Sequence, residues 1–190
     1  MKSILLFLCF SIGVCHFNYS QGDEQYYDES LYEYENPTLK KGYGSAGLGI
    51  GLNYGGFGGK FGYNVADKVN LFTGIGYNLN GLGFNAGVAY DYFTINRTSF
   101  YFSGMGGYNA VTAVEGAPEY TETFYGISFG TGFKMESKSR SGNYWEFGII
   151  LPIRNRQYGN MLDDIRNDPR IVDFSEPWPI LISVGYNAGF

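Results

Sequence analysis

The sequence predicts an all-β fold, an eight-stranded antiparallel up-and-down β-barrel that crosses a membrane. Its last residues, 180–190, alternate between large apolar side chains and mostly small or polar ones, which is the period of a strand with two different faces. The chain contains 29 Gly, 18 Tyr and 16 Phe, which suits a barrel with small residues inside and aromatic residues outside. After the first 20 residues no run reaches the roughly 18 apolar residues of a transmembrane helix, so strands would have to make the crossing.

Residues 1–20 have the pattern of a secretory signal peptide. Lys2 precedes an apolar stretch over 4–15, which is too short and too near the N-terminus to be a spanning helix. We expect cleavage between Ser20 and Gln21, followed by export of the remaining chain.

The composition narrows the possible chemistry. Both cysteines and the only histidine, Cys9, Cys15 and His16, lie inside the predicted signal peptide. The exported chain would then have no thiol or imidazole, so we expect no disulfide, no metal or other cofactor, and no enzymatic activity. A lipoprotein acylated at Cys15 is the alternative, although Val14 does not suit the residue before such a processing site. The net charge of −5 argues against a nucleic-acid partner.

Residues 21–42 form an acidic, tyrosine-rich segment ahead of the predicted barrel domain, 43–190. Its acidic side chains are interleaved with tyrosines, and no basic residue occurs before Lys40 and Lys41. This composition is typical of a disordered lead-in. A docking tail for a partner protein, with the tyrosines as anchors, is the alternative.

The first four predicted strands place large side chains on one face and mainly glycine, asparagine or charged residues on the other. They span residues 43–53, 57–65, 69–79 and 82–93. Their apolar faces carry Ala46, Leu48, Ile50 and Leu52; Phe57, Phe61, Tyr63 and Val65; Leu71, Thr73, Ile75, Tyr77 and Leu79; and Leu82, Phe84, Ala86, Val88, Tyr90 and Tyr92. The dipeptide Asn80-Gly81 predicts a two-residue hairpin between the third and fourth strands.

The last four predicted strands span residues 98–112, 121–134, 143–154 and 180–190. The phase of 98–112 is ambiguous. The preferred register turns Phe100, Phe102, Tyr108 and Ala110 outward, and the opposite one turns Tyr101, Met105 and Val111 outward. The other apolar faces carry Thr123, Tyr125, Ile127, Phe129, Thr131 and Phe133; Trp145, Phe147, Ile149, Leu151 and Ile153; and Ile180, Ile182, Val184, Tyr186, Ala188 and Phe190.

The connections fit a barrel whose two ends differ. With both termini at one end, that end carries the short connections 66–68, 94–97 and 135–142, while the longest ones, 113–120 and 155–177, fall at the other. The connection 155–177 holds both aspartates and arginines, so we expect a solvated loop whose charges pair with one another. A calcium site is the less favoured alternative, because the arginines would compete for the carboxylates.

The faces also indicate which side of the sheet meets lipid. The glycine-rich face carries Lys60, Asp91, Lys134, Glu146 and Arg154, while the apolar face carries almost no charge. The large apolar side chains would not fit inside eight strands, so they should face lipid and the charges should face the lumen. We expect these five residues to form a lumen charge network in which Lys60 pairs with Glu146 or Asp91.

Region 43–190 resembles the small eight-stranded barrels of Gram-negative outer membranes, the family typified by OmpX and the transmembrane domain of OmpA. The resemblance rests on the alternation, on the connections and on the last strand, with Phe190 and Tyr186. In that family a terminal Phe and the aromatics before it are read by the barrel-assembly machinery. The resemblance therefore implies an outer-membrane location, lipid and that machinery as partners, and an assembly signal at Phe190 and Tyr186.

These observations predict a non-enzymatic barrel rather than a catalyst. The preferred function is an accessory or structural subunit of an outer-membrane complex, which contacts other outer-membrane proteins. The alternatives are a standalone surface barrel in adhesion or envelope integrity, and a narrow pore.

Overall fold

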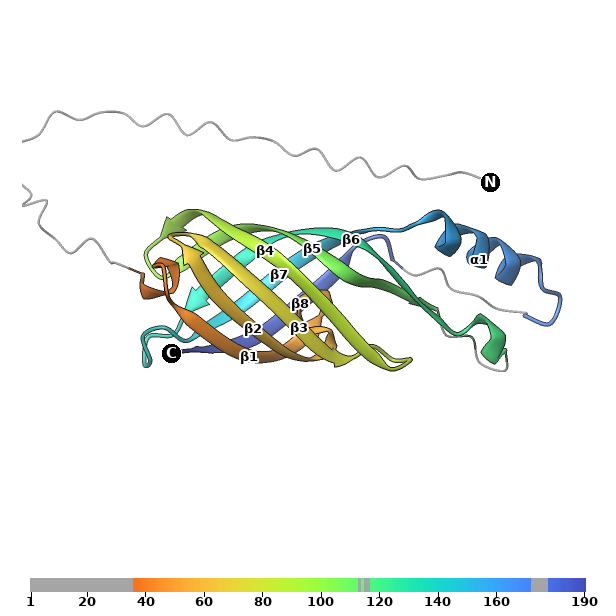
Figure 1. Ribbon diagram of the computed structural model, residues 1–190, viewed down its shortest axis with the longest axis horizontal. Coiled ribbons are helices and arrows are strands. Elements are labelled where there is room, and N and C mark those ends of the chain that lie inside the picture. Colours follow the sequence, from red (N-terminus) through yellow and green to blue (C-terminus); the bar gives the residue numbers. More distant parts are fainter. Residues whose placement is uncertain (1–35, 113, 115–116, 172–177) are drawn as a thin grey trace, which may run out of the picture. The chain divides into compact units, whose positions relative to one another are not determined.

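The computed structural model describes residues 36–112, 114, 117–171 and 178–190. Eight antiparallel strands follow one another around a closed barrel, each beside its neighbour in the chain (Figure 1). The strands are β1 (Gly44–Gly51), β2 (Gly56–Ala66), β3 (Val69–Tyr77), β4 (Leu82–Ile95), β5 (Thr98–Thr112), β6 (Glu122–Glu136), β7 (Tyr144–Ile153) and β8 (Leu181–Gly189). This confirms the predicted eight-stranded, antiparallel, up-and-down barrel. The predicted signal peptide and residues 21–35 lie outside the described residues.

The first and last strands close the sheet. The β1–β8 ladder runs up to the pair of Ile50 and Val184. Just beyond β8, Phe190 exchanges two backbone hydrogen bonds with Gly44, with N–O distances of 3.1 and 2.9 Å. Closure pairs every strand on both sides, which leaves no open sheet edge for another chain to add to.

The barrel has two different ends. We call one the terminal end, because β1 begins and β8 ends there. The connections at this end, 67–68, 96–97 and 137–143, are short, as expected. The other, the loop end, carries the remaining four connections, including the helix α1 (Arg156–Asn167) and the 3-10 helix η3 (Pro118–Tyr120) (Figure 1).

The chain ahead of β1 packs against inward-facing side chains at the terminal end. The 3-10 helix η1 (Pro37–Leu39) follows Asn36, whose Nδ2 donates to Ser99 Oγ at 3.2 Å. Asn64 Nδ2 donates to the carbonyl oxygen of Thr38 at 2.8 Å. The end of the predicted acidic segment, residues 36–42, therefore contacts the barrel.

Apart from β5 and the register shifts near Asn64 in β2 and Asp91 in β4, the side chains of the strands alternate as the sequence predicts. Large apolar and aromatic side chains point outward, and we call this surface the outer wall. The charged side chains within the strands are buried inside, except Glu122 at the start of β6.

The register that the sequence favours for β5 is partly wrong. Phe102 lies on the outer wall as predicted, but the outward placement of Tyr108 and Ala110 is wrong, because both are buried. Gly107 adopts φ +150°, and the β5–β6 register shifts between Tyr108 and Ala110. A bulge of this kind changes the phase of alternation partway along a strand, so no single register describes β5.

The prediction that the first strand reaches residue 53, with Leu52 on the outer wall, is also wrong. β1 ends at Gly51, whose φ of +129° turns the chain, and the 3-10 helix η2 (Leu52–Tyr54) folds into the barrel. Gly55, at φ +73°, then leads the chain back to β2. Glycine adopts these positive φ angles without strain, so Gly51 and Gly55 permit the inward fold. Leu52 joins a buried apolar cluster with Phe72, Ala89, Tyr101, Met105, Tyr108 and Ile150.

The β3–β4 turn lies one residue before the predicted Asn80-Gly81 hairpin. Its central residues are Leu79, at φ +76°, and Asn80, and it is closed by the hydrogen bond from Asn78 N to Gly81 O at 3.0 Å. Asn78 Oδ1 also accepts from the backbone N–H groups of Asn80 and Gly81. The side chain of Asn78 thus organises the turn, a role that asparagine often has.

The predicted solvated loop 155–177 contains the helix α1, which is a further correction. Asn155 Oδ1 caps the helix by accepting from Tyr158 N at 2.9 Å. Tyr158 is buried and packs edge-on against Phe124 of β6, with ring centroids 5.3 Å apart. Met161 and Leu162 pack with Tyr158 against Phe124 and Ala110. Ile165, at helical spacing from them, is also buried.

Across the described parts of the chain, no helix has both the length and the apolar character that a membrane span requires.

Candidate functional site

The inward faces of the barrel bury many polar side chains. These are mostly asparagines, serines and charged residues, interleaved with a few aromatic rings. The buried polar and charged residues of the strands are Ser45, Lys60, Asn64, Asn70, Asn85, Asp91, Ser99, Asn109, Thr112, Ser128, Lys134, Glu136, Glu146, Ser183 and Asn187. A buried polar group is costly unless it is hydrogen-bonded, so the pairing of these groups decides what the interior can do.

The shortest ion pair in the lumen joins β2 to β7. Lys60 Nζ lies 2.6 and 2.7 Å from the two carboxylate oxygens of Glu146. The side chains are only 4% and 1% exposed. Lys60 Nζ also lies 4.8 Å from the ring centroid of Phe72. The contact is therefore a desolvated, charge-assisted pair rather than a surface salt bridge.

A second ion pair lies next to the first. Lys134 Nζ is 2.7 Å from Asp91 Oδ2, and Lys134 stands directly opposite Glu146 in the β6–β7 ladder. The sequence leaves open whether Lys60 pairs with Glu146 or with Asp91. In the structure Lys60 pairs with Glu146, and Asp91 pairs with Lys134. We call these four side chains the charge cluster; its two positive and two negative charges balance.

The 3-10 helix η2 completes the polar surroundings of Glu146. Asn53 Nδ2 donates to Glu146 at 3.0 Å, and Tyr54 Oη donates to it at 3.4 Å. Asn187 Nδ2 donates to Tyr54 Oη at 2.8 Å, and Ser183 Oγ donates to Asn53 Oδ1 at 2.6 Å. Sequence reasoning missed Asn53 and Tyr54 as parts of this network, because it placed them at a strand end and in a turn.

Arg154, the fifth predicted lumen residue, does not join the charge cluster. It follows the end of β7 at the loop end, where its guanidinium lies 4.9 Å from the ring centroid of Tyr158. Its NH2 group donates to the backbone carbonyl of Trp178. The strand ends at Ile153, before the chain reaches Arg154, and the Arg154 side chain is half-buried at the loop end.

The predicted assembly residues lie at the terminal end of β8. Phe190 is 82% exposed, while its backbone pairs with Gly44. The Tyr186 ring packs edge-on against Trp145 at 5.2 Å, and its hydroxyl accepts from Asn143 Nδ2 at 2.9 Å. The ring of Phe190 is therefore accessible, whereas Tyr186 is held by its neighbours.

The charges at the loop end pair with one another, and apart from the nearly buried carboxylate of Asp168 these side chains are largely exposed. Arg166 contacts Asp163 at 3.3 Å, and Arg170 contacts both Asp168 at 2.6 Å and Glu119 at 2.8 Å. Hydrogen bonds from the Arg170 side chain hold the pKa of Asp168 well below its usual value. Among the residues that the structure describes, no group of three or more Asp, Glu, His or Cys side chains could hold a metal ion.

The close fit of Tyr54 under β8 leads to a testable prediction. The ring of Tyr54 fills the space that a Cβ atom on Gly185 would occupy, and its hydrogen bonds keep it there. We expect Gly185→Ala to lower the free energy of unfolding by about 1–3 kcal/mol through overpacking. The matched control is Gly106→Ala, where a Cβ meets no atom within 4 Å. Urea unfolding should show a loss of stability for the first variant and none for the control; equal midpoints would contradict the tight packing of Tyr54.

The site is thus a buried polar core, made of the charge cluster and η2, beneath a loop end that carries Arg154. Comparison with models of known protein families finds no match, and comparison with curated proteins finds none either.

Proposed function

We propose that this chain is a non-enzymatic integral β-barrel of a Gram-negative outer membrane, exported by a cleaved signal peptide, which acts as a structural or accessory subunit of a membrane complex. The observation that carries the proposal is the polarity of the barrel. Its inside combines buried charged and polar side chains with one apolar cluster, and its outside is apolar. A soluble β-barrel instead fills its interior with apolar side chains and turns its charges outward.

The outer wall supports a lipid environment. A soluble monomer rarely exposes a continuous apolar surface of more than a few hundred Å². Here every strand contributes large side chains that are more than a third exposed. They include Leu48, Ile50, Phe57, Phe61, Leu71, Ile75, Phe84, Val88, Phe102, Ile127, Phe129, Ile149, Leu151, Ile182 and Val184.

The filled lumen favours a structural role over a pore. Water in an open channel would reach the side chains that line it. Lys60, Asp91, Lys134 and Glu146 are instead almost fully buried, and their ion pairs join β2 to β7 and β6 to β4. Desolvated ion pairs in the lumen support a barrel that is closed to ions.

The tight connections at the loop end favour a subunit of a complex over a standalone adhesin. The β1–β2 connection folds inward as η2, and the β3–β4 connection is a short turn. Only the β5–β6 and β7–β8 connections extend beyond the strands (Figure 1). An adhesin would have to use these two connections, whereas the outer wall offers aromatic contacts such as the stacked rings of Phe133 and Phe147, 5.1 Å apart.

Purification in a mild detergent tests this proposal. We expect the protein in the outer-membrane fraction, with different gel mobility before and after boiling, and with a stoichiometric partner protein. Reconstituted into a planar bilayer, it should give no steady conductance. A soluble protein with heat-independent mobility would refute membrane integration. Purification without any partner would favour the standalone barrel, and steady conductance would favour the pore.

The exposed ring of Phe190 leads to a separate prediction. Because the ring contributes little packing, we expect Phe190→Ala to change the stability of the inserted barrel by about 1 kcal/mol or less. If the assembly machinery reads this residue, the same substitution should strongly reduce the amount of protein inserted in cells. Quantifying heat-modifiable protein in outer membranes checks this, with the wall substitution Leu48→Ala as control. A normal inserted level for Phe190→Ala would contradict the role.

A further inference from the structure

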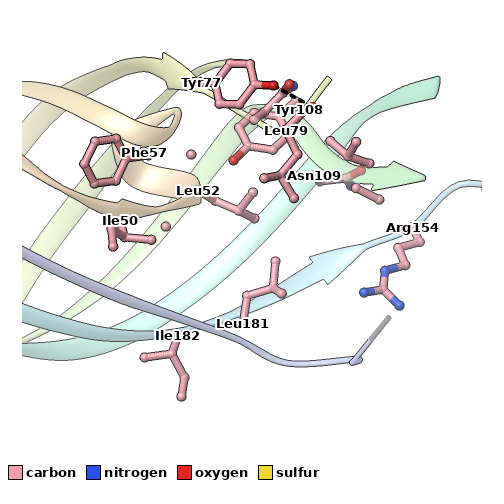
Figure 2. Close-up of a pocket in the computed structure, with 15 residues that line it drawn as sticks. Ile50, Leu52, Phe57, Tyr77, Leu79, Tyr108, Asn109, Arg154, Leu181 and Ile182 are labelled. Atoms are coloured by element: carbon pink, nitrogen blue, oxygen red, sulfur yellow. Dashed lines mark hydrogen bonds between the residues drawn. The ribbon is translucent and has the colours of Figure 1, made fainter. Parts of the chain in front are cut away.

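The loop end contains a pocket that passes through the barrel wall. Figure 2 shows the residues that line it. Its volume is about 390 Å³. Ile50, Phe57 and Ile182, which line it on one side, belong to the outer wall, whereas Leu52 and Tyr108 belong to the buried interior cluster. Because residues from both faces of one sheet line the same space, the pocket is a lateral notch between the membrane side and the interior.

The strand lengths explain the notch. The β1–β8 ladder ends at the pair of Ile50 and Val184, because η2 takes the chain away from the wall after Gly51. The β7–β8 ladder continues further, to the pair of Ile150 and Leu181. The first residues of β8 therefore extend past the end of β1, and the space beside them is the notch.

The lining is apolar except at one side. Leu181, Ala110 and Val111 add to the apolar residues already named, while the polar lining residues are Asn78, Asn109 and Arg154. Asn109 Nδ2 donates to the carbonyl of Ile153 at 2.8 Å, which ties it to the end of β7. Arg154 is half-buried and brings the one positive charge of this lining.

We propose that the notch binds the hydrocarbon chain of a single-chain anionic amphiphile, a fatty acid, with its carboxylate beside Arg154. The inference rests on the proposed membrane location, which brings hydrocarbon to the outer wall. An apolar pocket with a few placed polar groups is the usual form of a small-molecule site. A guanidinium is well suited to bind a carboxylate through paired N–H donors.

The volume sets the size of the ligand. A pocket of about 390 Å³ lies in the lower part of the range of small-molecule sites, roughly 300–1,000 Å³, which favours one hydrocarbon chain over the two chains of a phospholipid. Dodecanoic acid, which has a single chain, is therefore the probe.

Photo-crosslinking in vesicles tests the site. The barrel is reconstituted in phosphatidylcholine vesicles with dodecanoic acid that carries a diazirine near its methyl end, and the labelled residues are mapped by mass spectrometry. We expect labels on Leu52 and Tyr108, which annular lipid does not reach, as well as on the outer wall. Leu181→Trp fills the notch and should reduce the interior labels at least tenfold. The control Leu151→Trp, on the wall of β7, should leave them unchanged.

The headgroup is tested with a matched neutral probe. Arg154→Gln should lower interior labelling by the acid about tenfold, as expected for the loss of a charge-assisted hydrogen bond, and should leave labelling by the corresponding dodecanol probe unchanged. Equal loss for both probes would overturn the role of Arg154. Equal interior labelling by a diazirine phospholipid would overturn the single-chain assignment. Wall labelling without interior labelling, in a barrel with heat-modifiable mobility, would overturn the site and leave membrane integration intact; failure to insert would overturn both.

Discussion

Replacing Glu146 by Ala should lower the free energy of unfolding of the barrel by about 3–5 kcal/mol. The substitution leaves the Lys60 ammonium buried without its carboxylate, 2.6–2.7 Å away in the wild type. It also removes the acceptor of Asn53 and Tyr54, so that two further donors lose a partner. Because Lys60, Asn53 and Tyr54 are almost fully buried, solvent cannot replace the contacts that they lose.

Two variants separate the cost of an orphaned charge from a loss of packing. The double variant Lys60→Met with Glu146→Leu removes both charges and keeps apolar volume, so it should recover most of the stability that Glu146→Ala loses. Arg166→Ala, which breaks the exposed contact with Asp163, should change stability by less than about 1 kcal/mol. Urea unfolding in lipid vesicles, followed by gel mobility, measures all three. A wild-type unfolding midpoint for Glu146→Ala would refute the assignment of a desolvated ion pair between Lys60 and Glu146.

Ile149→Lys should be the most damaging single charge on the outer wall. Ile149 is 55% exposed on β7, opposite Thr131 and Ile182 in the neighbouring ladders. If this surface faces lipid, a lysine near the middle of the wall costs about 2–4 kcal/mol. A barrel in water would tolerate the same change within about 0.5 kcal/mol, because an exposed lysine is well solvated.

A matched substitution at the rim makes the test specific for a membrane. Ile153 points outward on the same strand, at its loop end, and is similarly exposed. The cost of a lipid-facing lysine falls to about 0–1 kcal/mol near the interface, so Ile153→Lys should leave stability almost unchanged. Reversible unfolding of both variants in vesicles measures the difference. Equal stability of the two variants would argue that lipid does not surround the wall.

Much of this architecture can be predicted from the alternation of residue types. In β6, β7 and β8 the large side chains assigned to the apolar face lie on the wall as expected, since a period of two leaves each side chain a single face. The alternation also placed Lys60, Asp91, Lys134 and Glu146 on the inward side, because a charge on the wall would be costly. It failed in β5, where the bulge after Gly107 changes the phase, because bulges depend on the register with the next strand.

The sequence by itself thus determined the strand count, the inside and outside of the wall, and the enclosure of Lys60, Asp91, Lys134 and Glu146, since these follow from local periodicity. Only the tertiary structure decided that η2 folds into the lumen and that Arg154 lies at the loop end. It also decided that Lys60 forms an ion pair with Glu146 and Lys134 with Asp91. Those outcomes depend on which strands face one another across the barrel and on where each ladder stops. Both are contacts between residues far apart in the chain, and a local pattern carries no information about them.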